Sequence, residues 1–193
     1  VELLPVHPDG LADLELLAKA ICDDTALVSV MAANNETGVL QPIADIAAMC
    51  REHGAWFHTD AAQGFGKIPL DVGAQNIDLL SISGHKVYGP KGIGALFVRR
   101  RPRIRLEPLF FGGGQERGIR SGTLPAPLCI GLGAAAAVAA ADMESDGERL
   151  AALRDRFLSR IRASLPDVQV NGSMHRRMPH NLNLTFQGDD AQD

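Results

Sequence analysis

Residues 83–94 read Ser-Gly-His-Lys-Val-Tyr-Gly-Pro-Lys-Gly-Ile-Gly, and an apolar run lies on either side of them. The runs at residues 77–82 and 95–98 are short and apolar, which is typical of buried strands. Glycines between two such strands let the backbone bend and come close to a ligand. A lysine held there, partly removed from water, has its charged form disfavoured and its amine made nucleophilic. The stretch therefore predicts a Schiff-base lysine at Lys86, and the simpler interpretation is a hairpin with a solvated lysine.

The chain before this stretch alternates between apolar strands and a helix. Residues 26–32 form an apolar, β-branched run, which predicts a strand buried on both faces. Pro42 is suited to the first position of a helix, and Gly54 is suited to its end. Residues 55–59 and 78–82 are the next predicted strands. This alternation predicts an α/β fold in which a mostly parallel sheet is covered by helices.

Polar clusters follow three of the predicted strands. Asn35 comes after the first strand, Asp60 and Gln63 after the second, and residues 83–86 after the third. In parallel sheets, ligands bind beyond the carboxyl ends of the strands. We therefore expect the three clusters to face one crevice, although each of them alone would also suit an ordinary turn.

The remaining segments predict further elements. Residues 1–6 predict a short strand, and residues 11–21 have the apolar period of a helix. Residues 99–105 are basic and predict a solvated surface turn. The glycine-rich residues 110–123 contain two arginines, so their backbone N–H groups could bind an anion such as phosphate.

The C-terminal part predicts two helices and two strands. Residues 125–143 are nearly all apolar, which predicts a buried helix. Residues 144–165 predict a second helix with one apolar stripe in the core. That stripe consists of Leu150, Leu153, Phe157, Ile161 and Leu165. Strands at residues 168–170 and 182–186 complete this part. We expect residues 1–143 to form a large domain and residues 144–193 to begin a smaller α+β domain.

Composition narrows the class of protein. The 193 residues are 46% hydrophobic and 22% charged, as in ordinary globular domains. A net charge of −4 gives no basic footprint for nucleic acid. The apolar run at residues 128–141 is too short to span a bilayer, so we expect no membrane partner. Both ends look cut, and we expect the chain to be a fragment.

The cysteines and histidines do not form a metal-binding pattern. Cys22, Cys50 and Cys129 are far apart and lie in apolar surroundings. They predict buried free thiols in a reducing compartment, which here means the cytoplasm. The six histidines are scattered without metal spacing, so we expect no metal site.

The polar clusters suit one cofactor, pyridoxal phosphate. Such an enzyme must supply an amine, an acid for the pyridine nitrogen and donors for the phosphate. Lys86 can be the amine, and Asp60 can be the carboxylate against the ring nitrogen. Gln63 can hydrogen-bond the phenolic oxygen, while Ser83 and His85 can donate to the phosphate. A separate turn at each cluster would not explain the whole set.

Four motifs resemble the cysteine desulfurases of the NifS/IscS group. They are Asn-Asn-Glu-Thr-Gly at residues 34–38, Asp-Ala-Ala-Gln at 60–63, the lysine stretch at 83–96, and Arg-Ser-Gly-Thr at 120–123. The group belongs to the class V aminotransferases, which are fold-type I pyridoxal phosphate enzymes. The resemblance covers nearly the whole chain, so it implies the large domain of that fold followed by the start of the small domain.

The resemblance also implies a role for each candidate residue. Lys86 would hold the cofactor covalently and move protons at the α-carbon of the substrate. Asp60 would pair with the pyridinium nitrogen and Gln63 with the phenolic oxygen. Ser83 and His85 would bind the phosphate.

Two further residues take their roles from the resemblance. Asn35 would lie beside the cofactor oxygen and the substrate carboxylate. Thr123 would reach the phosphate of the neighbouring subunit, which implies a homodimer with shared sites. The reaction would convert L-cysteine to L-alanine and leave sulfur as an enzyme persulfide for iron–sulfur cluster assembly, with a NifU/IscU-type scaffold as acceptor.

The chain departs from the family pattern in ways that affect activity. The family's nucleophilic cysteine lies on a loop downstream of residues 182–186, and the chain ends before that loop. Cys22, Cys50 and Cys129 do not match it. The family's amino-terminal part, with a ring-stacking histidine, and its later substrate-binding arginine are also missing. We therefore expect the chain to be inactive by itself.

Two alternatives remain open. A selenocysteine lyase or another class V enzyme would share the fold, but the Arg-Ser-Gly-Thr motif at residues 120–123 argues against it. A non-catalytic remnant kept for dimerisation or scaffold binding would not need Asp60, Gln63, His85 and Lys86 together.

Overall fold

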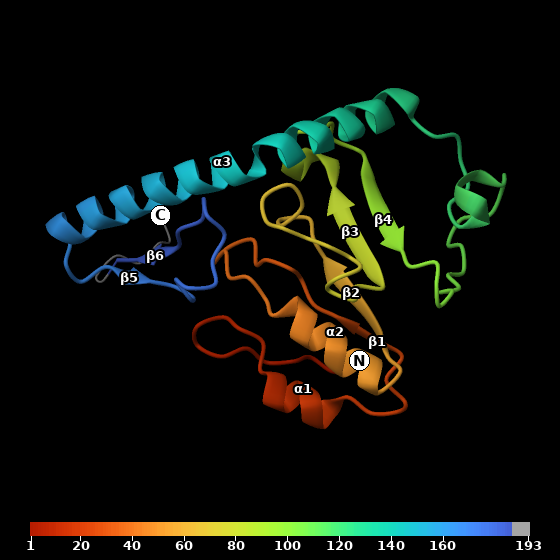
Figure 1. Cartoon of the computed structure of the whole chain (residues 1–193), viewed down its shortest axis with the longest axis horizontal. Helices are drawn as coiled ribbons and strands as arrows, with labels where there is room; N and C mark the ends of the chain where they lie inside the picture. Colours follow the sequence, from red (N-terminus) through yellow and green to blue (C-terminus); the bar gives the residue numbers. More distant parts are fainter. Residues whose placement is uncertain (187–193) are drawn as a thin grey trace.

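A four-stranded sheet lies at the centre of the computed structural model, which describes residues 1–186 (Figure 1). Its strands are β1 (Leu27–Ser29), β2 (Trp56–Asp60), β3 (Leu79–Ser83) and β4 (Gly94–Val98), in that spatial order. β1, β2 and β3 run parallel to one another, and β4 returns antiparallel to β3. The predicted α/β fold with a mostly parallel sheet is confirmed.

Helices α1 (Leu14–Ala20) and α2 (Ile43–Glu52) form the hydrophobic core together with the side chains on one face of the sheet. α2 follows Pro42 and ends before Gly54, whose φ of 72° is left-handed, so the predicted start and stop signals are confirmed. Ile46 of α2 and Phe57 of β2 are both fully buried. Each large apolar side chain buried in this way contributes about 1.5–3 kcal/mol.

The opposite face of the sheet carries polar side chains towards the carboxyl ends of the parallel strands. Because side chains alternate along a strand, the strand register puts Ser29, His58 and Asp60 on the face opposite Phe57. Ser81 is paired with Asp60 and shares this face. β1 is also more exposed than its sequence predicts, with Leu27 half exposed. The prediction of a strand buried on both faces over residues 26–32 is wrong, because α2 packs on only one face of the sheet.

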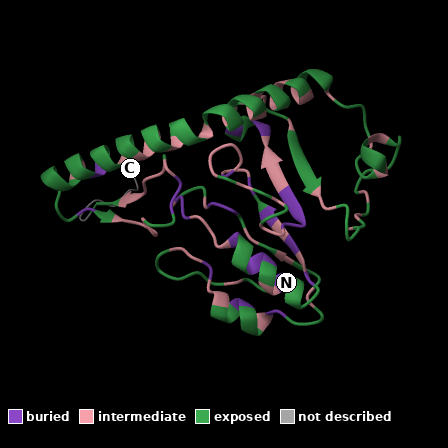
Figure 2. Ribbon diagram, in the orientation of Figure 1, coloured by how far each residue is buried: buried purple, intermediate pink, exposed green. Residues whose placement is uncertain are grey.

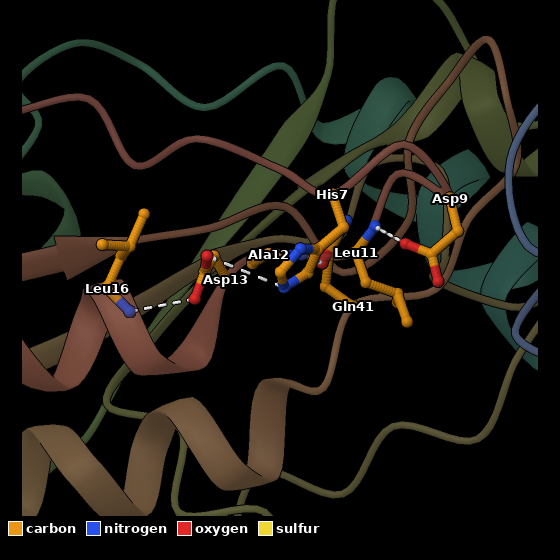
Figure 3. Close-up of polar contacts among 7 residues, drawn as sticks. All are labelled: His7, Asp9, Leu11, Ala12, Asp13, Leu16 and Gln41. Carbon is orange, nitrogen blue, oxygen red and sulfur yellow. Dashed lines mark hydrogen bonds and ion pairs between the residues drawn. The ribbon is translucent and has the colours of Figure 1, made fainter.

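The N-terminal segment, residues 1–6, is irregular and not a strand, and a turn follows it at residues 8–10. In residues 1–6 the only bridge is between Val6 and Ala12. Figure 3 shows how side chains hold the chain beyond it. Gln41 accepts from the Ala12 N–H at 2.8 Å and donates to the Gly10 carbonyl at 2.7 Å. Asp13 caps α1 by accepting from the Leu16 N–H at 2.9 Å. The predicted strand at residues 1–6 is therefore wrong.

α3 is one continuous helix, Ala126–Ser164, where the sequence predicted two. No proline interrupts it after residue 127, and its single interior glycine beyond residue 133 costs too little to break it. The domain boundary predicted at residue 143 falls inside this helix. α3 extends from the main sheet to the short antiparallel pair β5 (Gln169–Val170) and β6 (Leu184–Thr185), as Figure 1 shows.

The predicted burial of residues 125–143 is wrong. Figure 2 shows α3 as mostly exposed, and Ile130 and Val138 are 73% and 62% exposed. The predicted core stripe is also incorrect in part, since Leu153 and Phe157 are exposed and the buried residue of this half is Leu158. Apolar composition predicted burial, but it could not predict which partner covers the helix. By length and composition α3 could also cross a membrane, which is weak evidence on its own.

A buried ion pair joins the start of β3 to the end of β4. Arg99 Nε lies 2.9 Å from Asp78 Oδ1, and both side chains are largely buried. The other carboxylate oxygen of Asp78 accepts from the Phe57 N–H at 2.9 Å. Arg99 also donates to the Ile77 carbonyl. The prediction of a solvated turn at residues 99–105 is therefore wrong for Arg99, which is largely buried.

Candidate functional site

The lysine stretch folds as a short 3₁₀ helix, η1 (Gly84–Val87), directly after β3. A Cβ at Gly84 would lie 2.9 Å from the Pro90 carbonyl oxygen, and one at Gly94 would lie 2.6 Å from the Ile82 carbonyl oxygen. These glycines therefore let the two arms of the loop approach each other. Tyr88 ends η1 in the left-handed region, at φ 62°. The loop joins the antiparallel strands β3 and β4, and His85 and Lys86 on it are exposed. The hairpin with a solvated lysine is therefore what the structure shows, and the prediction that Lys86 is partly removed from water is wrong for this chain.

α3 contacts this loop through two small residues, Gly131 and Ala135, which are four positions apart and so lie on one face of the helix. A Cβ at Gly131 would lie 2.5 Å from Cγ of Pro90, and a Cβ at Gly89 would lie 3.3 Å from Cβ of Ala135. Small side chains are needed here because the helix and the loop are in direct contact. The half-exposed N-terminal part of α3 therefore fixes the position of the lysine loop.

The strand ends come together as predicted. Asp60, the last residue of β2, is paired with Ser81 of β3, and the Ala61 N–H donates to the Ser81 carbonyl at 2.9 Å. On the other side, the Ala32 N–H donates to the Asp60 carbonyl at 2.8 Å. The chain segments after β1, β2 and β3 therefore lie at one edge of the sheet, with Asp60 between the other two.

Asp60 is exposed, and its carboxylate accepts from the Ala62 N–H at 2.8 Å. His58 lies two residues earlier, and its Nδ1 is 2.7 Å from the Ser29 hydroxyl. Burial lowers the pKa of His58, and the negative charge of Asp60 opposes that shift. Asp60 is therefore close enough to influence the histidine beside it while its own side chain remains open to solvent.

Ser83 and His85 form a pair beside the lysine. The Ser83 hydroxyl oxygen lies 3.1 Å from His85 Nδ1. Two groups that can donate hydrogen bonds therefore lie side by side within three residues of Lys86. The half-buried Gln63 follows Asp60 by three residues on the turn after β2. This set fits a flat cofactor that carries a ring nitrogen and a phosphate, because it supplies a carboxylate, two donors and an amine at one sheet edge.

Lys67 is a basic residue that the sequence interpretation missed. Burial lowers the pKa of Lys67, and the positive charge of Lys86 lowers it further. The two ammonium groups are therefore near each other, although they lie on different loops. The only sequence signal for Lys67 is its place in a glycine-rich turn, at residues 64–67.

A cavity of about 730 Å³ opens beside Lys67, between η1 and α3. Its walls include Tyr88, Val138 and His180. Burial lowers the pKa of His180, and the charge of Lys67 contributes in the same direction. The cavity is bounded mainly by apolar and small side chains, which is the usual character of a pocket that receives an organic group.

Asn35 and Thr123 lie on separate loops. Asn35 is exposed, and the Asn34 side chain holds its turn by accepting from the Glu36 and Thr37 N–H groups, both at 2.9 Å. Thr123 lines a second cavity of about 390 Å³ in the glycine-rich loop, together with Phe111. The structure therefore places Asp60 and Ser83 at the carboxyl ends of neighbouring parallel strands, with Gln63, His85 and Lys86 on the segments that follow, and leaves Thr123 in a loop of its own.

Some polar groups of the glycine-rich loop at residues 110–123 hydrogen-bond to one another. The Ser121 hydroxyl donates to the Gly113 carbonyl at 2.8 Å, and the Gly122 N–H donates to the Gln115 side chain at 3.1 Å. η2 (Gln115–Gly118) lies at its centre. Leu109, Phe110 and Phe111 are largely exposed. The anion site predicted for this loop stays a prediction.

The cysteines differ in their environment. Cys50 is fully buried, and burial followed by the charge of Asp78 raises its pKa to about 11. Cys129 is partly buried and Cys22 is exposed; all three are free thiols. The prediction of buried thiols is therefore correct for Cys50 and wrong for Cys22.

Comparison with known proteins identifies related chains. This chain is 58% identical over 188 residues to the cysteine desulfurase IscS of Rickettsia rickettsii (strain Iowa), covering 97% of this chain and 46% of that protein. The solved structure of DndA from Streptomyces lividans is 46% identical, with a TM-score of 0.89 over 98% of this chain and 53% of that one. A NifS-like protein from Rickettsia africae ESF-5 is 34% identical, with a TM-score of 0.91 over 98% of this chain and 52% of that one.

The chain thus spans about half the length of the relatives that it matches. The family model described as aminotransferase class V matches it over residues 1–193. With this match and these relatives, the chain belongs to the class V aminotransferase family.

Proposed function

We propose that this chain is the lysine-bearing part of a pyridoxal phosphate-dependent cysteine desulfurase, which takes sulfur from L-cysteine and leaves L-alanine. The observation that supports the proposal is the pairing of parallel strands β2 and β3, in which Asp60 pairs with Ser81, two residues before the Ser83-Gly84-His85-Lys86 segment. Similarity to the IscS of Rickettsia rickettsii supports the choice of reaction.

Pyridoxal phosphate is the cofactor of class V aminotransferases, and when bound it withdraws electrons from the substrate's α-carbon. In this chain the exposed amine of Lys86 would attach to it and would hold or move a proton at that carbon. The carboxylate of Asp60 would keep the ring nitrogen protonated, since an opposite charge favours the protonated form. Ser83 and His85 would donate to the phosphate.

The remaining roles belong to loops. Gln63 would hydrogen-bond the phenolic oxygen, and Asn35 would contact the same oxygen and the substrate carboxylate. Thr123 would bind the phosphate in a neighbouring subunit of a homodimer, for which the exposed Phe110 and Phe111 provide apolar surface. A NifU/IscU-type scaffold would receive the sulfur in the cytoplasm for iron–sulfur cluster assembly.

The sulfur-transfer step needs a nucleophilic thiolate. Cys50 is buried, and its raised pKa keeps the thiol protonated at neutral pH. We therefore propose that Cys50 takes no part in sulfur transfer. We also propose that the 193-residue chain binds the cofactor but does not form a persulfide from L-cysteine by itself.

Absorbance titration with pyridoxal phosphate tests the proposal. The wild-type chain should develop a visible band that Lys86→Ala lacks, because a lysine amine is needed for the covalent attachment. Asp60→Asn should keep the band but weaken it and shift its pH dependence, since the carboxylate no longer favours a protonated ring nitrogen. Lys91→Ala is the matched control, because Lys91 is an exposed lysine on the same loop, four residues after the end of η1. It should behave as wild type. A band unchanged in Lys86→Ala would refute the assignment.

A further inference from the structure

The turn that carries Asn35 is held from outside by a segment far away in the sequence. The Asn181 side chain donates to the Glu36 carbonyl at 3.0 Å, and the Asn183 side chain donates to the same oxygen at 3.3 Å. The Met178 N–H donates to the Gly38 carbonyl at 2.8 Å. The carbonyl oxygen of Glu36, the residue after Asn35, therefore accepts two hydrogen bonds, from Asn181 and Asn183.

Arg177 organises this contact. It is only 6% exposed, and its Nη1 donates to the Asn181 side-chain oxygen at 2.9 Å. Its other nitrogens donate to backbone carbonyls, of Ser173 through Nε and of Asn171 and Gly172 through Nη2. Because Arg177 takes the oxygen of the Asn181 amide, the NH₂ of that amide faces Glu36.

The surroundings of Arg177 are unusual for a buried cation. Its hydrogen-bond acceptors are all neutral, and within residues 1–186 no ion pair joins it to a carboxylate. Burial lowers the pKa of Arg177, and the nearby positive charge of Arg154 adds to that shift. The hydrogen bonds from Nε, Nη1 and Nη2 to neutral oxygens offset part of the cost of burying this charge, and they fix the guanidinium in one orientation.

The backbones meet closely at this contact. A Cβ at Gly38 would overlap the Asn181 side chain, and Gly38 has a left-handed φ of 72°. A Cβ at Gly172 would lie 2.6 Å from Val39 and 3.3 Å from Arg177 Nη2. Val39 and Arg177 also form a backbone bridge. Any shift of Arg177 therefore has to move the turn as well.

We propose that Arg177 and Asn181 are positioning residues that hold the Asn35 turn in the geometry in which Asn35 meets the cofactor and the substrate carboxylate. Arg177 orients the Asn181 amide, Asn181 fixes the Glu36 carbonyl, and the fixed carbonyl sets the place of Asn35. The functional part of this inference rests on the proposed role of Asn35, whereas the mechanical part rests on the contacts alone.

Two variants test the Arg177–Asn181 contact and the Asn181–Glu36 contact separately. Asn181→Asp has nearly the same shape and keeps the acceptor for Arg177, but it replaces the donor to Glu36 with an oxygen. Arg177→Met removes the guanidinium and keeps apolar volume. Arg176→Met is the matched control, because its exposed side chain makes none of these contacts.

Amide hydrogen exchange on the full chain tests, without any cofactor, whether Arg177 and Asn181 hold the turn. In Asn181→Asp and Arg177→Met, the amides of residues 36–40 should exchange about 3–10-fold faster than in wild type, as expected for loss of one hydrogen bond. In Arg176→Met they should exchange as in wild type. Equal exchange in Asn181→Asp and the control would overturn the proposal.

The visible absorbance band of the cofactor-loaded chain tests whether Arg177 and Asn181 position Asn35 at the cofactor. Asn35→Ala should shift the pH at which this band changes, and both Asn181→Asp and Arg177→Met should shift it in the same direction. If exchange accelerates but the band does not follow Asn35→Ala, the contact is only structural and the positioning role is refuted. If wild type binds no cofactor, the proposed function fails, and the exchange result still decides whether Arg177 and Asn181 hold the turn.

Discussion

At the scale of single residues, the structure separates charges that stabilise the fold from charges available for chemistry. Asp78 is buried and shared between Arg99 and the Phe57 N–H, so its interactions are saturated. Asp60, on the neighbouring strand, is exposed at the sheet edge. The sequence puts Asp78 at the start of a predicted strand and Asp60 directly after another, and only the three-dimensional contacts show which of the two is structural.

Removing Asp78 should destabilise the fold strongly. Asp78→Ala leaves Arg99 buried without its partner, which costs about 3–5 kcal/mol of unfolding free energy. Asp146→Ala breaks an exposed ion pair with Arg149 on α3 and should cost less than about 1 kcal/mol. Urea unfolding followed by circular dichroism measures both. Equal losses in the two variants would contradict the buried pair.

Cys50 should make stability depend on alkaline pH. Its pKa is raised to about 11 from an ordinary value of 9.0, so the folded state favours the protonated thiol. This contribution is fully present below pH 9.0, and it declines as the pH rises from 9.0 towards 11 because the unfolded thiol ionises first. In Cys50→Ala, the difference between unfolding free energies at pH 8 and pH 10.5 should be smaller than in wild type. An unchanged difference would contradict the raised pKa.

At the scale of elements, local signals predicted α2 well and α3 poorly. Pro42 and Gly54 are direct backbone constraints, so the limits of α2 follow from the sequence. The length of α3 and the exposure of its apolar residues depend on which surface covers it, and composition carries no such information. Residues 1–6 were mistaken for a strand because an apolar run of that length suits a strand only when a neighbouring strand exists to pair with it.

The contact between α3 and the lysine loop should be sensitive to added volume. Gly131→Leu would push Pro90 away, and overpacking of this kind costs about 1–3 kcal/mol. Gly133→Ala is the matched control, because nothing lies within 4 Å of its added Cβ. It should stabilise α3 by about 0.5–1 kcal/mol through helix propensity. Thermal unfolding distinguishes the two, and a neutral Gly131→Leu would show that α3 does not support the loop.

At the scale of the whole molecule, the mostly parallel sheet and the place of Asp60 and Lys86 at its strand ends were predictable from the sequence, and the contacts between distant segments were not. Asp60 ends β2 and Lys86 lies just after β3, and the general rule for parallel sheets predicts that ligands bind beyond such strand ends. Asn181 contacts Glu36 across 145 positions of sequence, and no periodicity or turn signal encodes that contact. Lys67 was missed for the same reason, since its closeness to Lys86 arises from two loops meeting.

The central claim is that Lys86 is the lysine that holds the cofactor. The most direct measurement is borohydride reduction of the chain mixed with pyridoxal phosphate, followed by peptide mapping of the modified lysine. The account predicts a single major site at Lys86, with Lys67 and Lys91 largely unmodified. Modification mainly at Lys67, or spread evenly over the three lysines in folded protein, would contradict it.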